Sequence, residues 1–477
     1  MKEVVMIVET TDNLCNNALK NTDFRYLRSA EEVAYFVGND GRCFCYGAGS
    51  YGKRFVKYCR KHELKLDGFI VSDDKITEKR IMDMPVYHLC DIIKQQNIRI
   101  IVAVNEMLHL EIANELFKYK DNAFAVKYLC NVPQFMIDDF EKEVAERCSL
   151  NLLEDYEKIA DEFSDKLISR DYGSNVSYGH AHMMKRLLGI PSNAPFPDRI
   201  LHGLGWTGHI LYYEIDYNNY CGNKIYVSGK QWRDYLATLL PHKKIIDIGN
   251  YIRYEKPLYG REDFEKYKTA LGRTLLVFPY HSIRNNKEDV KVSYEIEFLI
   301  EEIEKRKVDF DSVMVCMYYY DVQIHNDKPF EKKGYKIVTA GHMHDYNFTR
   351  RLRSIIELSD VTMSNSIGSH LPYCVCLKKP HYLFKQNINF NCEDAYWKGG
   401  KQQLDVELYS KDYNGRYFFN LPIKEPSETA RMYKALEECF SKWTERLTDE
   451  QIELVTYVYG DMSPISEKET MNWYVES

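Results

Sequence analysis

The sequence predicts an α/β protein with three Rossmann-like domains followed by C-terminal helices. Short apolar runs alternate with amphipathic segments along most of the chain, and many of these runs end at Gly, Ser or His residues. Such alternation is typical of parallel strands joined by helical crossovers. The 477 residues also exceed what one ordinary hydrophobic core organises, so we expect several globular domains.

The composition indicates a globular protein without a membrane span. Hydrophobic residues make up 45% of the chain and charged residues 28%, and no run of about 18 apolar residues is present. The first residues, MKEVVMIVETTD, lack the pattern of a secretory signal. We therefore expect a cytoplasmic protein. The net charge of -7 argues against nucleic acid as the main partner.

The sequence does not predict a metal site. The 13 Cys are scattered without a C-x-x-C pair, so reduced core residues are a better interpretation than metal ligands or disulfides. No D-x-D motif lies near the candidate site of the second half, so an obligatory divalent metal is not suggested. We expect that no cofactor is required.

The first domain, residues 1–140, is predicted to alternate strand and helix. Apolar runs predict the strands Cys43–Tyr46, Gly68–Val71, Pro85–Tyr87 and Ile100–Val104. Amphipathic segments predict the helices Ser50–Lys61, Leu89–Gln95 and Leu108–Lys118. This order indicates a Rossmann-like parallel sheet.

A glycine-rich turn follows the first of these strands. Gly47, Gly49 and Gly52 have G-x-G-x-x-G spacing, and Asp73 follows the second strand. Such a turn lets the backbone approach a pyrophosphate, and the carboxylate is placed to bind ribose hydroxyls. The same turn occurs in Rossmann-like domains that merely pack closely, so both interpretations stay open.

The second domain, residues 141–260, begins with a predicted acidic helix over residues 143–168. Its apolar face consists of Leu152, Tyr156, Ile159, Phe163 and Leu167. Three short strands are predicted after it, at Arg199–Leu201, Lys224–Val227 and Lys244–Ile248. Each ends at a polar loop, so the loops are expected to gather at one edge of a sheet.

The charged stretch RYEKPLYGREDFEKYKTALGR leads into the third domain, residues 261–425. Its predicted strands are Thr274–Phe278, Ser312–Met317, Tyr335–Val338 and Val361–Met363. Its predicted helices are Lys291–Lys307 and Phe348–Leu358, with a further helix after the segment SNSIGSH. Residues 426–477 form the last part, with two helical patterns.

Four polar loops of the second half follow predicted strands: LHGLG, PYHSIRN, TAGHMHD and SNSIGSH. Ligands of open α/β sheets bind at the carboxyl ends of strands. We therefore expect His202, His281, His342 and the turn at residues 364–369 to converge on one site. A single histidine in such a loop is also typical of a structural role, in which the ring only forms hydrogen bonds within the protein. The prediction therefore depends on the four loops taken together.

The segment SNSIGSH has the composition of a phosphate-binding turn. Ser364, Asn365 and Ser366 offer hydroxyl and amide groups, and Gly368 permits close approach of the backbone. Ser369 precedes a predicted helix N-terminus, where unpaired N–H groups favour an anion. Ser and Asn are also the usual helix-capping residues, and capping is compatible with binding.

The run YGAGSYGKRFVKYCRKHELKLDGFIVSDD, with MPVYHL and IIVAVN after it, resembles the N-terminal Rossmann-like domain of bacterial sugar acyltransferases. The resemblance implies recognition of a nucleotide sugar rather than hydride transfer. Gly47, Gly49, Gly52 and Asp73 would be its binding positions. An NAD-dependent oxidoreductase and a non-catalytic nucleotide-sugar-binding module stay open as alternatives.

The segments ILHGLG, IYVSGKQWRDYL, DIGNYIRY, FPYHSI and TAGHMHDYNFTRRLRSIIELSDVTMSNSIGSHLPYCVCLKKPHY resemble GT-B glycosyltransferases of bacterial capsule and lipopolysaccharide synthesis. The resemblance implies that residues 141–260 form the N-terminal, acceptor half and residues 261–425 the C-terminal half, which binds the donor nucleotide. Sialyltransferases of this fold have a His and a Ser-rich turn comparable to His281 with Ser364 and Ser366. Polyol-phosphate transferases of the teichoic-acid type have an HG dipeptide early in their sequence, comparable to His202 and Gly203.

Two features depart from these families. The loop near residue 280 reads YHS rather than the HP of the sialyltransferases, and residues 150–255 are few for a full acceptor half. The first domain is therefore either an appended third domain, which we favour, or part of the acceptor half.

The resemblance implies metal-independent transfer of a sugar from a nucleotide-activated donor to a growing surface polysaccharide or a lipid-linked acceptor. The phosphate leaving group gains negative charge in such a reaction, and preorganised donors stabilise it. The groups expected to bind it follow strands or lie on the next helix: His281, His342, Arg350, Ser364, Asn365, Ser366, Gly368 and Ser369. We expect His202 to act as the base for the acceptor hydroxyl.

Polyol-phosphate transfer from a CDP-activated donor is the main alternative within enzymes. The expected partners are a nucleotide sugar and an oligosaccharide or lipid-linked glycan. A lipid-linked acceptor would place the protein peripherally at the inner face of the membrane. The sequence is compatible with a homo-oligomer, and the donor sugar, the linkage and the oligomeric state stay open.

Overall fold

The computed structural model describes residues 24–75, 79–131, 133–161, 171, 173–192, 194–201, 222–282, 291–391 and 426–463. The chain divides into two compact units, and the boundary along the chain lies between residues 143 and 144. Helix α6 (Gln134–Cys148) runs through this boundary. The finer division at residues 260 and 425 stays a prediction.

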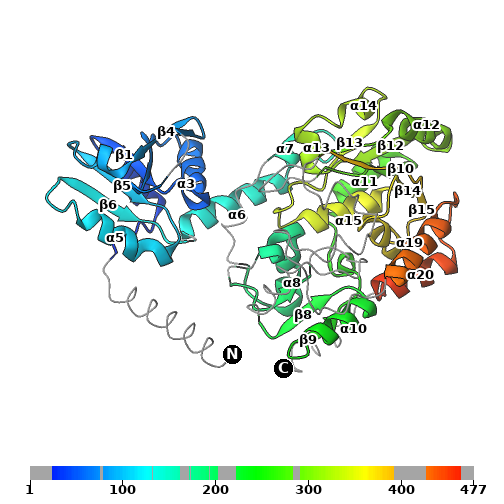
Figure 1. Cartoon of the computed structure of the whole chain (residues 1–477). Coiled ribbons are helices and arrows are strands. Elements are labelled where there is room, and N and C mark those ends of the chain that lie inside the picture. The colour runs from blue at the N-terminus through cyan, green and yellow to red at the C-terminus, as the bar shows by residue number, and fades with distance from the viewer. Residues whose placement is uncertain are drawn as a thin grey trace. The chain divides into compact units, whose positions relative to one another are not determined.

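The first unit is built on a six-stranded sheet in the order β3-β4-β2-β1-β5-β6, in which only the pair β3–β4 is antiparallel (Figure 1). The strands are β1 (Arg42–Tyr46), β2 (Gly68–Val71), β3 (Arg80–Ile81), β4 (Met84–His88), β5 (Ile98–Val102) and β6 (Phe124–Tyr128). The helices are α2 (Ala30–Gly38), α3 (Ser50–Lys61), α4 (Leu89–Ile92) and α5 (His109–Phe117). The predicted Rossmann-like sheet is confirmed, whereas α2 and the edge strand β6 were not predicted.

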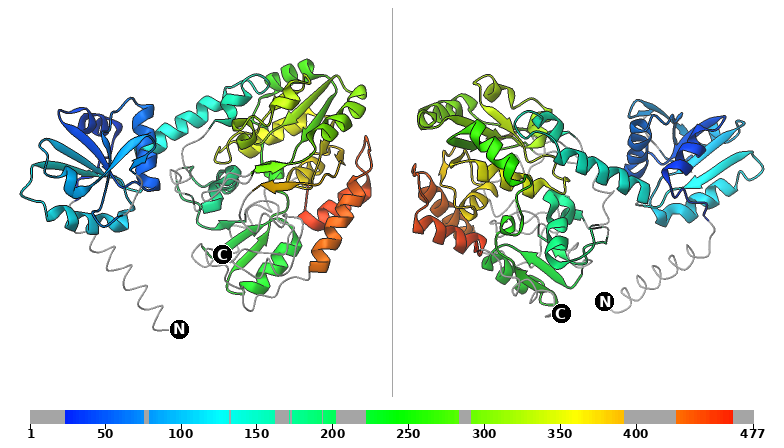
Figure 2. Two further views of the ribbon diagram at one scale, coloured as in Figure 1. Left: turned by 45° about the horizontal axis from the view of Figure 1, so that its top comes forward. Right: turned by 180° about the vertical axis from the view of Figure 1, so that it is seen from behind.

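The second unit contains two parallel sheets, in the orders β7-β8-β9 and β13-β12-β10-β14-β15 (Figure 2). The strands of the smaller sheet are β7 (Arg199–Ile200), β8 (Lys224–Val227) and β9 (Lys244–Asp247). Those of the larger sheet are β10 (Thr274–Phe278), β12 (Ser312–Cys316), β13 (Lys336–Val338), β14 (Val361–Ser364) and β15 (His381–Leu383). One apolar cluster includes side chains from both sheets, among them Tyr226 of β8 and Leu276 of β10.

Helices surround both sheets. The helices that precede the larger sheet along the chain are α7 (Tyr156–Ala160), α8 (His180–Leu188), α10 (Lys230–Leu239) and α11 (Arg261–Leu271). Those of the larger sheet are α12 (Ile296–Arg306), α13 (Tyr319–Gln323), α14 (Lys328–Glu331), α15 (Phe348–Leu358) and α16 (His370–Cys376). The two C-terminal helices are α19 (Pro426–Phe440) and α20 (Asp449–Tyr459), as the two helical patterns predicted.

The prediction of one helix over residues 143–168 was wrong. Helix α6 ends at Cys148 and α7 is a separate short helix. The Nη1 of Arg147 donates hydrogen bonds to the carbonyl oxygens of Lys158, at 2.7 Å, and Ile159, at 3.2 Å. These contacts bring the end of α7 back to the end of α6, which a continuous helix does not allow. Phe163 and Leu167 lie outside the described residues.

The predicted helix at Lys291–Lys307 begins later than expected. Lys291–Ser293 forms strand β11, which pairs antiparallel with β16 (Asn389–Asn391). Helix α12 starts at Ile296. A long-range pairing partner about 100 residues away along the chain has overridden the local helical pattern at its start.

The C-terminal helices connect the two sheets of the second unit. Helix α20 packs against α10, beside the smaller sheet (Figure 1), and against α16, beside the larger one. Its end lies over the loops that follow β8 and β9. The Ser228 hydroxyl donates to the carbonyl oxygen of Tyr459 at 2.6 Å, and the Asn250 N–H donates to that of Asp461 at 3.1 Å.

These loops were predicted to gather at one edge of the sheet. In the structure they hold the chain's own C-terminal segment. The described part of the second unit thus contains two parallel sheets, and the C-terminal helix α20 contacts a helix beside each of them. The predicted α/β class with parallel sheets is confirmed, and the GT-B arrangement of these sheets stays a prediction.

A glycine substitution tests this C-terminal contact. Gly229 has a φ of +99°, and a Cβ there would lie 2.7 Å from the carbonyl oxygen of Val458. Gly229→Ala is expected to lower the free energy of unfolding by about 1–3 kcal/mol. Gly260→Ala is the control, because a Cβ at Gly260 meets nothing within 4 Å. Urea denaturation followed by circular dichroism compares the two, and equal midpoints would contradict the account.

Candidate functional site

The larger sheet of the second unit is doubly wound. The chain starts at β10 in the middle, proceeds through β12 and β13 to one edge, and returns through β14 to β15 on the other side. The carboxyl ends of β10 and β14 therefore adjoin where the strand order reverses. Sheets of this kind bind ligands in the loops at that switch point.

The side chain of Asn365 holds these loops together. Its Oδ1 accepts a hydrogen bond from the Tyr280 N–H at 2.7 Å, directly beyond β10. Its Nδ2 donates to Oε1 of Gln386 at 3.1 Å, beyond β15. Asn365 is fully buried, so its amide group is used in joining three chain segments. The prediction that it binds phosphate stays untested, but the structure gives it a positioning role.

Ser364 also makes its contacts inside the protein. Its hydroxyl donates to the carbonyl oxygen of Ser366 at 2.8 Å and lies 3.0 Å from Nε2 of His381. His381 is buried between this hydroxyl and that of Thr362, and burial lowers its pKa well below the ordinary value. Ser364 therefore shapes the turn rather than presenting its hydroxyl at the surface.

The rest of the turn is arranged around the ring of His370. This ring stacks on Phe278 at 5.0 Å between centroids, and its Nε2 lies 3.2 Å from the carbonyl oxygen of Ser366. Burial lowers the pKa of His370 to about 3, so the ring is neutral near pH 7. A Cβ at Gly368 would lie 2.9 Å from this ring. Ser369 occupies the N-cap position of α16.

His281 lies at the carboxyl end of β10, as predicted. Its Nδ1 lies 2.9 Å from the carbonyl oxygen of Ser282. Its ring contacts Tyr318, which follows β12, with the centroids 4.3 Å apart. The ring is partly exposed, so it can meet a ligand at this edge.

His342 lies in the loop that follows β13. Its Nδ1 accepts a hydrogen bond from the His344 N–H at 3.2 Å, so the neutral ring carries its proton on Nε2. The ring contacts Tyr319 at 4.2 Å between centroids, and Tyr319 contacts Tyr318 at 4.6 Å. A row of aromatic rings thus connects His342 with His281 along the carboxyl edge.

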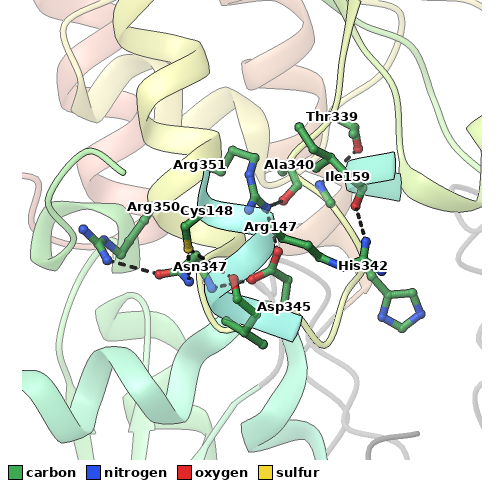
Figure 3. A network of polar contacts seen from close by, with 12 residues as sticks. Arg147, Cys148, Ile159, Thr339, Ala340, His342, Asp345, Asn347, Arg350 and Arg351 are labelled. Carbon is green, nitrogen blue, oxygen red and sulfur yellow. Dashed lines mark hydrogen bonds and ion pairs between the residues drawn. The ribbon is translucent and has the colours of Figure 1, made fainter. Parts of the chain in front are cut away.

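A buried ion pair supports the His342 loop (Figure 3). The Nη1 of Arg351 donates to Oδ2 of Asp345 and to the carbonyl oxygen of Ala340, both at 2.7 Å. Neither charged side chain is exposed. Burial alone would lower the pKa of Arg351, but its neighbours, with Asp345 foremost, together outweigh burial and raise it. Figure 3 shows the His342 ring pointing away from this pair, toward the opposite side of the loop.

The candidate ligand Arg350 points elsewhere. Its guanidinium donates to Oδ1 of Asn347 at 3.1 Å and to the carbonyl oxygens of Lys256 and Pro257, at 3.5 and 3.4 Å. Its neighbour Arg351 is fully buried. Arg353 is partly buried and pairs with Glu357 at 2.7 Å. These three arginines therefore connect α15 to its surroundings.

Tyr178 is a residue of this edge that the sequence did not reveal. It precedes α8 with a φ of 59°, which is uncommon for a residue other than glycine. Its N–H donates to the carbonyl oxygen of Met343, and its side chain shares a hydrogen bond with Tyr318. Its position depends on contacts made far along the chain, so no local pattern indicates it. His202, the predicted base, lies outside the described residues.

The glycine-rich turn of the first unit also lies at a switch point, between β1 and β5. A Cβ at Gly47 would lie 2.6 Å from Val104, and one at Gly52 would lie 1.7 Å from the carbonyl oxygen of Gly47. These two glycines are required by packing. At Gly49 a Cβ would meet nothing within 4 Å, so that position is open to a ligand.

Asp73 already accepts two hydrogen bonds within the first unit. Its Oδ1 accepts from the Cys90 N–H at 2.9 Å and its Oδ2 from the Tyr119 hydroxyl at 3.2 Å. The carboxylate is exposed, so further hydroxyl groups can still reach it.

Comparisons with known proteins add little to this geometry. The chain matches no protein-family model and no curated protein sequence. Among solved structures, a variant of the wall teichoic acid polymerase TagF soaked with CDPG aligns with 99% of this chain and 94% of its own, at 11% identity and a TM-score of 0.29. A TM-score this low supports no conclusion about the chain.

Two further properties concern the described residues alone. Within them, no group of three or more His, Cys, Asp or Glu side chains is placed to hold a metal ion. In the same part of the chain, no helix combines the length and apolarity needed to cross a bilayer.

Removal of the buried carboxylate tests the support of the His342 loop. Asp345→Asn leaves the Arg351 cation buried without its ion-pair partner, so we expect a loss of about 3 kcal/mol in unfolding free energy. Glu357→Gln is the matched control on α15, because it removes the partner of the partly exposed Arg353 and should cost less than about 1 kcal/mol. Urea denaturation measures both. A loss for Asp345→Asn no larger than the control's would show that the pair does not support the loop.

Proposed function

We propose that the second unit is a glycosyltransferase that binds a nucleotide-activated sugar at the carboxyl edge of its larger sheet. The observation that carries this proposal is the switch point between β10 and β14, where the loops bearing His281 and Asn365 adjoin. Nucleotides bind at such points in doubly wound sheets because their phosphates can approach the loop backbone. Histidines at the ends of β10 and β13 suit an anionic leaving group.

The proposed chemistry follows from these histidines. As the bond between the sugar and the phosphate breaks, negative charge develops on the phosphate oxygen. His342 is buried, and in its neutral form the ring carries its proton on Nε2, because its Nδ1 accepts from the backbone. His281 is placed along the same edge. In this proposal both imidazoles, with Ser366 and the backbone at Gly368, bind the donor phosphate.

Other predicted residues take indirect or unassigned roles in the proposal. Ser364 and Asn365 hold the turn in shape, because their polar groups bind other parts of the chain. Ser369 and Arg350 stay candidate phosphate ligands in this proposal. We propose His202 as the base that deprotonates the acceptor hydroxyl, which its place after β7 and Leu201 in the sequence favours.

We further propose that the first unit binds a nucleotide sugar at Gly47, Gly49 and Gly52, which the open space at Gly49 supports. The acceptor would be an oligosaccharide or a lipid-linked glycan of a surface polysaccharide. A lipid-linked acceptor would place the protein in the cytoplasm, peripherally at the inner face of the membrane. The assignment of the first unit depends on its resemblance to sugar acyltransferases, and that of the acceptor depends on the resemblance of the second half to capsule and lipopolysaccharide enzymes.

Donor binding tests the function. A thermal-shift screen of nucleotides and nucleotide sugars should find one class that stabilises the full chain. With that donor, His281→Gln and His342→Gln should each weaken binding at least about 10-fold by calorimetry, because hydrogen bonds to a charged group are lost. His242→Gln is the control, because His242 is exposed in the loop before β9, away from the carboxyl edge.

Unchanged affinity in both the His281 and His342 variants would overturn the proposed donor site. The nucleotide released during turnover separates the two transferase classes. A nucleoside diphosphate is expected for glycosyl transfer. Release of CMP from a CDP-activated polyol would instead favour polyol-phosphate transfer, and a nicotinamide fluorescence change would favour an oxidoreductase.

A further inference from the structure

A buried carboxylate lies behind His281. Asp321 is on α13, immediately after β12, and is 2% exposed. Its Oδ2 accepts the Ser282 N–H at 2.9 Å, and its Oδ1 accepts a hydrogen bond from Nδ2 of Asn326 at 2.7 Å. The segment YYYDVQ contains this residue directly after a predicted strand, yet nothing in its spacing pointed to the site.

The backbone of Ser282 connects this carboxylate to the imidazole. Its N–H is bound by Asp321, and its carbonyl oxygen lies 2.9 Å from Nδ1 of His281. Its hydroxyl accepts a hydrogen bond from the Val292 N–H at 3.1 Å. Ser282 is fully buried and is held by all three groups, so it provides a fixed platform for the histidine ring.

This geometry determines the protonation pattern of His281. A carbonyl oxygen only accepts hydrogen bonds. The Nδ1 of His281 therefore carries a proton and donates a hydrogen bond to the carbonyl oxygen of Ser282. In the neutral ring the basic nitrogen is then Nε2. When Nε2 takes up a proton, the ring becomes an imidazolium with an N–H donor at Nε2, and a nearby buried carboxylate stabilises that charge.

In the described part of the chain, the titratable groups that face His281 include residues from three elements. Tyr280 follows β10, Tyr318 and Asp321 belong to the start of α13, and His370 belongs to α16. Burial raises the pKa of both tyrosines and lowers that of His370, so these three are neutral near pH 7. Burial likewise raises the pKa of Asp321, and His281 acts in the opposite direction. Asp321 and His281 therefore influence each other's charge.

We propose that Asp321 is a positioning residue that, through the Ser282 peptide, fixes His281 with Nδ1–H toward the backbone and favours its charged form. The charged ring then directs Nε2–H at an oxygen of a diphosphate. The choice of ligand depends on the proposed transferase function, whereas the effect on the His281 ring does not. A diphosphate, which carries its own negative charge, is the chemical class that such an imidazolium selects.

Histidine-selective ¹⁵N NMR of the full chain tests this proposal without a substrate. The His281 resonances, assigned by their loss in His281→Gln, should show the Nδ1–H tautomer at high pH. In Asp321→Asn the titration midpoint of His281 should fall by about one pH unit, because the charge that stabilises the imidazolium is removed. Asn326→Ala is the matched control, since it alters the same carboxylate's surroundings but keeps its charge, and it should lower the midpoint much less.

An unchanged His281 midpoint in Asp321→Asn would overturn the proposal. Where that variant does not fold, the unmodified chain decides, because a dominant Nε2–H tautomer would contradict the assigned geometry. Calorimetry with inorganic pyrophosphate provides a second readout. Asp321→Asn should bind it about 10-fold more weakly at pH 7.5 and regain affinity at lower pH, which a purely structural defect would not do. Absence of pyrophosphate binding alongside the expected NMR shift would count against the transferase function only.

Discussion

The hydrogen bonds of Asn365 are the interaction on which the candidate site depends. Its buried amide group binds the backbone beyond β10 and the side chain of Gln386 beyond β15, so the ends of three parallel strands are held in one arrangement. A parallel sheet brings its carboxyl ends to one edge but does not position the loops that leave it. Here the side chain of Asn365 positions these loops. Its hydrogen bonds fix the turn at Ser364–Ser369 relative to the His281 loop.

The edge that results is lined by imidazoles and tyrosines. The row from His281 through Tyr318 and Tyr319 to His342 joins the loops of three strands, and each histidine is oriented by a backbone group. Buried charged groups support the loops that carry these histidines. Asp321 binds the peptide N–H of Ser282, next to His281, and the Arg351–Asp345 pair supports the His342 loop. At the smaller sheet, the corresponding loops bind the chain's C-terminal segment instead.

Much of the fold could be predicted because apolar periodicity is local. The bounds of β10 and α15 agree with the predicted ones, since Thr274–Phe278 is a continuous apolar run and Phe348–Leu358 has one buried face. The placement of His281 and His342 at strand ends followed from the same pattern. What failed depended on contacts outside the local pattern: Arg147 binds the backbone of α7 where one long helix was expected, and β11 pairs with β16. Tyr178 and Asp321 gave no local signal. Ser364 and Asn365 were recognised as candidate phosphate ligands, but in the structure their polar groups form hydrogen bonds inside the protein.

The most direct test of the donor site is a crystal structure of the full chain soaked with the nucleotide sugar that binds most tightly. The account predicts difference density for the diphosphate at the carboxyl edge of the larger sheet, within hydrogen-bond distance of His281 and His342. Density confined to the glycine-rich turn at Gly47–Gly52, with the edge between β10 and β14 unoccupied at saturating ligand, would contradict it.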